Sequence, residues 1–113
     1  MSARRGDGPV LTVIRWQEIP AQVTARDGER SARAELPGRF QRAIDRAAMG
    51  GGLAGSEEYL AHWVTQPRPC GADLEAEVAA EVEALVAAYP PAVVEELVRR
   101  VRAARVDEPG DDR

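Results

Sequence analysis

The sequence predicts an α+β fold in which a three-stranded antiparallel β-meander packs against a small set of about four α-helices. A nearly continuous apolar, β-branched run at residues 10–16 predicts the first strand. The dipeptide Asp27-Gly28 lies between two segments that alternate between apolar and polar residues, which predicts a β-hairpin. After Pro37, apolar residues recur at the spacing of amphipathic helices. The strands are therefore expected first along the chain and the helices after them.

The length of the chain indicates one domain. Its 113 residues are close to the usual size of a domain with a single core, which we place at residues 10–105. Residues 1–9 and 106–113 are expected to be disordered tails. Aromatic residues make up only 4% of the chain, so the core should consist mainly of small aliphatic side chains.

The three strands have a predicted order and register. Residues 10–16 are expected to form the central strand, and only Gln17 and Glu18 separate them from the hairpin, which favours a meander. With Asp27 and Gly28 as a type I′ loop, the register pairs Arg26 with Glu29, Ala25 with Arg30, Val23 with Ala32, Ala21 with Ala34, and Ile19 with Leu36. The core face of the hairpin is then formed by Ile19, Ala21, Val23, Ala32, Ala34 and Leu36.

The second part of the chain predicts helices near residues 39–49, 56–65, 73–89 and 91–105. Asp73 is expected to cap the third helix, and Pro91 is suited to the first turn of the fourth. Residues 66–71 contain two prolines, each of which lacks a backbone donor and restricts the residue before it. We predict a rigid connector there, which can be neither a helix nor a central strand.

Charge and composition exclude several classes of function. All 15 basic residues are Arg, and the formal net charge is −4. Residues 1–46 hold nine Arg against six acidic residues, whereas residues 47–98 hold one Arg against nine. Such an acidic chain is not expected to bind nucleic acids generally, although a local basic face is possible. No apolar run approaches the ~20 residues of a membrane span, and no signal peptide is recognisable, so we expect a cytoplasmic protein without membrane contact.

The candidate reactive residues are few, and no cofactor or metal site is expected. Cys70 is the only cysteine and His62 the only histidine, and their spacing matches no metal-ligand motif. Cys70 precedes the third predicted helix, whose dipole could lower the pKa of its thiol. The alternative is that Cys70 is a small buried apolar residue that closes a turn. His62 is expected to be a half-exposed surface residue of the second predicted helix, and the alternative is a ligand or an acid/base, including one that acts with Cys70 as nucleophile.

Three arginines form the best candidate binding surface. Arg39, Arg42 and Arg46 share one face of the first predicted helix, and Arg33 of the hairpin could adjoin them. A solvated helix face is one interpretation of this cluster. The others are contact with an acidic protein partner, with the chain's own acidic third helix, or with a phosphate-bearing ligand.

Several ordered segments resemble the small bacterial "virulence factor" domain family. These segments are residues 19–23 (Ile-Pro-Ala-Gln-Val), 35–40 (Glu-Leu-Pro-Gly-Arg-Phe), 43–49 (Ala-Ile-Asp-Arg-Ala-Ala-Met), Tyr59-Leu60 with Trp63, and 68–71 (Arg-Pro-Cys-Gly). The resemblance spans roughly residues 10–89 and includes no catalytic motif. It implies no established activity, because the family is named from a virulence-associated protein in which a related domain accompanies a scaffold-like region and helical repeats. It also implies at most an accessory role beside corrinoid- and folate-dependent methyltransferases, near whose genes stand-alone members are encoded.

Two classes of function remain open. The first is a non-enzymatic interaction or accessory module that binds a protein partner, which the lack of convergent catalytic groups favours. The second is a small thiol-dependent redox or accessory component of one-carbon methyl transfer that uses Cys70. We expect the first.

Overall fold

A computed structural model of the chain describes residues 8–50 and 61–106. Within them the chain forms four strands and three helices, in the order β1 (Val10–Trp16), β2 (Ile19–Asp27), β3 (Arg30–Glu35), α1 (Gly38–Gly50), β4 (Trp63–Pro69), α3 (Leu74–Ala88) and α4 (Pro91–Val106). The α+β class and the antiparallel sheet are confirmed. The predicted numbers of three strands and four helices are wrong for the part of the chain that is described.

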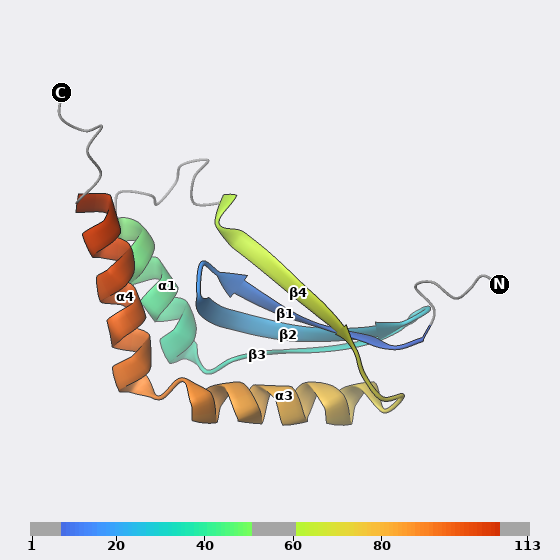
Figure 1. Cartoon of the computed structure of the whole chain (residues 1–113). Coiled ribbons are helices and arrows are strands. Elements are labelled where there is room, and N and C mark those ends of the chain that lie inside the picture. The colour runs from blue at the N-terminus through green and yellow to red at the C-terminus, as the bar shows by residue number, and fades with distance from the viewer. Residues whose placement is uncertain (1–7, 51–60, 107–113) are drawn as a thin grey trace.

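The four strands form one antiparallel sheet in the order β3-β2-β1-β4. β1 therefore lies between two strands, as its apolar, β-branched sequence predicts. The sheet extends away from α1 and α4, which stand side by side near the β1–β2 turn, while α3 runs along the sheet (Figure 1). α3 packs against β2 and β3, and α1 packs against α4 and β2. α1 and α4 thus pack on each other as well as next to the sheet.

The core consists largely of small aliphatic side chains, as the composition predicts. Its largest members, Trp16 and Phe40, are fully buried. Leu11, Val13, Val23 and Ala25 share one face of the central strands, and they are also buried. The helices add a second group of buried side chains, formed by Ala43, Ile44, Ala47, Leu74, Val78, Leu85, Val94, Leu97, Val98 and Val101.

The hairpin between β2 and β3 differs from the prediction by two residues in register. Asp27 pairs with Arg30, so the loop is Gly28-Glu29 and not Asp27-Gly28. Gly28 has φ +64°, whereas Asp27 and Glu29 have no positive φ. This is the pattern of a type II′ turn with glycine first, so the type I′ assignment is wrong. A two-residue shift in register leaves each paired side chain on its own face, so Val23, Ala32 and Ala34 share the core face as predicted. Ile19 and Leu36 are also buried, and Ala21 lies at an irregularity in the β1–β2 pairing.

β4 replaces two predicted features. Residues 56–60 of the predicted second helix lie outside the described residues and residue 61 is helical, whereas residues 63–65 are strand, so the helix is wrong for residues 63–65. Residues 66–69 are strand as well, which corrects the predicted rigid connector. The exposed edge of β1 explains both corrections, because a non-local pairing partner outweighs the helix-like spacing of residues 59–64.

The prolines of β4 fit its place at the edge of the sheet. The amide of Gln17 donates to the carbonyl oxygen of His62 at 2.9 Å, and the amide of Cys70 donates to the carbonyl oxygen of Pro9 at 3.2 Å. Antiparallel bonding alternates along a strand, so the even-numbered residues of β4 bond to β1 and the odd-numbered ones point outward. Pro67 and Pro69 therefore occupy positions where no donor to β1 is needed.

The helices α1, α3 and α4 agree closely with the predicted ranges. The side chain of Asp73 accepts a hydrogen bond from the amide of Ala76 at 3.1 Å, so Asp73 caps α3 as predicted. None of the helices in the described residues is long and apolar enough to cross a membrane. The expected tails lie almost wholly outside the described residues, and Val106 is the last residue of α4.

Candidate functional site

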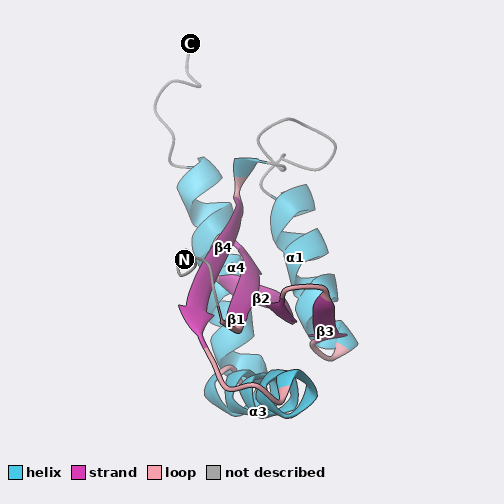
Figure 2. Ribbon diagram, turned by 90° about the vertical axis from the view of Figure 1, so that its right-hand side faces the viewer, coloured by secondary structure: helices cyan, strands magenta, loops and turns pink. Residues whose placement is uncertain are grey.

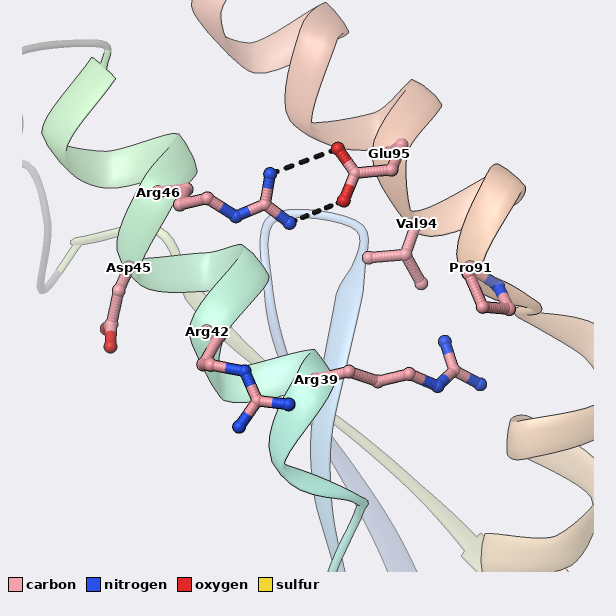
Figure 3. A pocket seen from close by; sticks show the side chains of 7 residues that line it. All are labelled: Arg39, Arg42, Asp45, Arg46, Pro91, Val94 and Glu95. Atoms are coloured by element: carbon pink, nitrogen blue, oxygen red, sulfur yellow. Dashed lines mark hydrogen bonds and ion pairs between the residues drawn. The ribbon is translucent and has the colours of Figure 1, made fainter.

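α1 and α4 enclose a groove of about 350 Å³, which we call the α1–α4 groove. Its lining residues are Arg39, Arg42, Asp45 and Arg46 from α1, and Pro91, Val94 and Glu95 from α4 (Figure 3). The three arginines come from successive turns of α1, where a spacing of three or four residues places side chains on one face. The predicted arginine cluster on α1 is thus brought together in the groove.

Arg46 is the arginine that closes the groove against α4. Its Nη1 and Nη2 atoms donate to Oε1 and Oε2 of Glu95 at 3.0 and 2.5 Å, which makes a two-bond ion pair (Figure 3). This hydrogen bonding holds the pKa of Glu95 below its usual range and raises that of Arg46. Both side chains are about half exposed, so the pair is screened by solvent. Arg46 therefore already has a partner, and that partner lies on α4 and not on α3.

Arg39 lies deeper in the groove. Its aliphatic stem extends beneath Val94 toward Pro91 (Figure 3), and its guanidinium carbon lies 4.4 Å from the centroid of the Phe40 ring. The Nη1 atom of Arg39 is buried and has no hydrogen-bond partner. A buried donor without a hydrogen-bond partner is costly, and an acceptor from another molecule reaches this atom only after the Arg39 side chain turns toward the groove.

Arg42 and Asp45 complete the rim of the groove. The guanidinium group of Arg42 extends back along α1, where its Nη1 atom lies 2.9 Å from the place a Cβ on Gly38 would take. Asp45 points away from α4 (Figure 3). Asp45 accepts a hydrogen bond from Nε2 of Gln41 at 3.0 Å. Within residues 8–50 and 61–106, Arg42 forms no ion pair. The lining therefore combines three guanidinium groups and two carboxylates with an apolar side formed by Pro91 and Val94.

Arg33 does not join the other three arginines. It lies on β3, exposed, with Thr24 of β2 as its cross-strand neighbour, and it does not line the groove. The sequence predicted that it could adjoin the cluster, but the groove forms between α1 and α4. The α4 residues of the groove were not predicted, because their approach to α1 depends on tertiary packing.

His62 directly precedes β4 and Cys70 directly follows it, so they lie at opposite ends of this strand. A strand rises ~3.3 Å per residue, so more than about 20 Å separates them. His62 instead packs edge-on against Trp16, with ring centroids 5.7 Å apart and an interplanar angle of 78°. The described residues therefore contain no thiol–imidazole pair, and no group of three or more His, Cys, Asp or Glu among them could hold a metal ion.

The environment of Cys70 favours the protonated thiol. Burial raises its pKa, and the nearby charge of Glu77 acts in the same direction, whereas Arg68 opposes them. Glu77 folds back over Gly71, where an added Cβ would lie 2.7 Å from its Oε2 atom. Cys70 is half-buried against the core, and the combined effect of burial and neighbouring charges on its pKa is upward.

These features define a small α+β domain that carries an arginine-lined groove between two of its helices. The chain belongs to the Virulence factor family, whose model matches residues 14–98. This match confirms the resemblance found in the sequence. No curated protein and no solved structure matches the chain.

Proposed function

We propose that the protein is a non-enzymatic interaction module that binds an acidic segment of a protein partner in the α1–α4 groove. The observation that carries this proposal is the arrangement of Arg39 and Arg42. Both side chains line the groove, the Nη1 atom of Arg39 is buried without an acceptor, and neither side chain forms an ion pair within residues 8–50 and 61–106. Guanidinium groups bind carboxylates with two parallel hydrogen bonds, so these two side chains suit Asp or Glu of a partner.

The apolar side of the groove adds a requirement for the partner. Pro91 is exposed at the edge of the groove, so a partner's aliphatic side chain can contact it while a neighbouring carboxylate approaches Arg39; Val94 is buried behind it. An acidic peptide with an apolar residue beside its carboxylates fits both sides. A free phosphate would use the arginines alone.

The alternative, a thiol-dependent component of one-carbon methyl transfer, has less support. A reactive cysteine needs a lowered pKa and a nearby base or cation that dominates its surroundings. At Cys70 the pKa is raised instead, and His62 lies at the other end of β4. These observations support the interaction module over the thiol component.

The test is affinity capture from the native cell, followed by affinity measurement with each purified partner. Arg39→Gln and Arg42→Gln should each weaken binding of the true partner about tenfold or more, since a charge-assisted contact is lost. Arg26→Gln, on the exposed face of β2, is the matched control and should leave binding unchanged. Equal binding by the groove variants and the control would contradict the proposal.

A further inference from the structure

The two edges of the sheet differ in their ability to accept another strand. On the outer edge of β4, two of the outward positions are Pro67 and Pro69, which have no amide hydrogen to donate. This half of the edge is therefore closed to strand addition. β3 forms the opposite edge (Figure 2) and contains no proline.

The outward-pointing residues of β3 follow from its bonding to β2. The amide of Leu36 donates to the carbonyl oxygen of Ala21 at 3.0 Å, and Asp27 pairs with Arg30 across the two-residue loop. Both observations place the even-numbered residues of β3 in bonded pairs with β2. The backbone N–H and C=O groups of Ser31, Arg33 and Glu35 consequently point away from the sheet, along an open edge.

The side chains of Arg33 and Glu35 are both exposed and lie on the same face. Their cross-strand neighbours on β2 are Thr24 and Gln22, which carry no charge. Within the described residues neither Arg33 nor Glu35 forms an ion pair. The open edge thus presents one cation and one anion, two residues apart, without intramolecular partners.

We propose that β3 pairs antiparallel with β3 of a second copy of this chain, which makes one continuous sheet across a two-fold axis. The outward-pointing residues allow three central registers. One places Arg33 opposite Arg33 of the second copy and is disfavoured by repulsion, and another places Arg33 opposite Ser31. The third places Arg33 opposite Glu35 twice, with Ala34 on the axis.

In the third register, Arg33 and Glu35 each gain an ion-pair partner, and the outward backbone N–H and C=O groups gain hydrogen-bond partners. Each Arg33–Glu35 pair exchanges two backbone hydrogen bonds, and its side chains lie on the solvent face as direct neighbours. Charge complementarity therefore selects a second copy as the occupant of this edge. The proposed dimer surface is separate from the α1–α4 groove, so it stands whether or not the groove binds an acidic partner.

The test is sedimentation of the full-length protein over a wide range of concentrations. The unmodified protein should show a reversible monomer–dimer equilibrium. Arg33→Glu and Glu35→Arg should each weaken dimerisation about tenfold or more, because each places like charges opposite one another twice. The double variant R33E/E35R should restore it, and Arg26→Glu on the neighbouring strand is the matched control.

Amide hydrogen exchange of the unmodified protein provides a second measurement that needs no variant. The amides of Arg33 and Glu35 should exchange rapidly in dilute protein and become protected as concentration rises, while the inward amide of Ala34 is protected throughout. A monomer at every concentration would overturn the proposal. A dimer that the single charge reversals leave intact, or that the double reversal fails to restore, would overturn it as well.

Discussion

Arg46 of α1 and Glu95 of α4 form a two-bond ion pair that bridges one end of the α1–α4 groove. Because Arg46 is already paired with Glu95, it is not available to bind an external anion, in contrast to the other two arginines of the groove. It also positions α4 opposite α1 at the point where Arg39 passes beneath Val94 (Figure 3). The pair thus affects both stability and ligand affinity.

Glu95→Gln should make the groove bind an acidic peptide more tightly, because Arg46 then has no carboxylate partner. The stability change should be small at neutral pH, since both side chains are half exposed. Isothermal titration with a Glu-rich peptide measures the affinity. Glu96→Gln, which removes the neighbouring partner of Arg99, is the control and should not change it.

The same pair predicts a pH dependence. The pKa of Glu95 is lowered in the folded protein, so its contribution to stability is present above the unfolded value near 4.5. It is lost as the pH falls through the lower, folded pKa. The melting temperature of Glu95→Gln should therefore lie below that of the unmodified protein at pH 6, and the difference should vanish in acid. A difference that grows in acid would contradict this assignment.

Cys70 is predicted to be structural. Cys70→Ser should cost about 1 kcal/mol, because a hydroxyl replaces a thiol in a partly apolar site, and Cys70→Ala should be milder. Iodoacetamide should label the native thiol slowly. The pH at which the labelling rate reaches half its maximum should lie above the ordinary thiol pKa of about 8.5. Rapid labelling near pH 7, together with unchanged melting of the Ser variant, would favour thiol chemistry instead.

The turn between β2 and β3 predicts a difference between two neighbouring substitutions. Gly28→Val should cost about 1–2 kcal/mol, because a β-branched residue is strained at the φ of +64°. Asp27→Asn should be nearly silent, since it removes only an exposed ion pair with Arg30. Chemical denaturation of both variants checks the prediction, and equal losses of stability would argue against the positive φ at Gly28.

The alternation of β4 predicts which positions tolerate another proline. Thr65→Pro should have a small effect, because the amide of Thr65 points outward. Gln66→Pro should cost about 1–3 kcal/mol more than Gln66→Ala, because it removes a bond to β1 and leaves its acceptor without a partner. Denaturation midpoints of the three variants measure this. If Thr65→Pro lowered stability more than Gln66→Pro, the deduction that the even-numbered residues of β4 bond to β1 would be wrong.

Local signals in the sequence were sufficient for the elements that depend on local physics. The spacing of Phe40, Ala43, Ile44 and Ala47 predicted α1, and Asp73 correctly marked the start of α3. The register of the hairpin was missed because Asp27-Gly28 suits a type I′ loop, and nothing local distinguishes it from a type II′ loop that begins at Gly28.

Non-local pairing explains what the sequence could not predict. Pro67 and Pro69 argue against a strand in general. They are compatible with a strand only at the edge of a sheet and at positions whose amides point away from the neighbouring strand. For the site, helical spacing predicted that Arg39, Arg42 and Arg46 share a face. Pro91, Val94 and Glu95 could not be predicted as the opposite wall, because helix packing brings them there.

The position of β4 next to β1 has a consequence for the newly made chain. Ribosomes release β1, β2 and β3 well before β4, so for that interval the Val-Leu-Thr-Val-Ile-Arg-Trp strand is an uncovered edge. It combines high β-propensity with a single charge and no proline, which are the properties of aggregation-prone segments. The speed of translation between residues 37 and 63 should therefore determine how much this protein needs a chaperone.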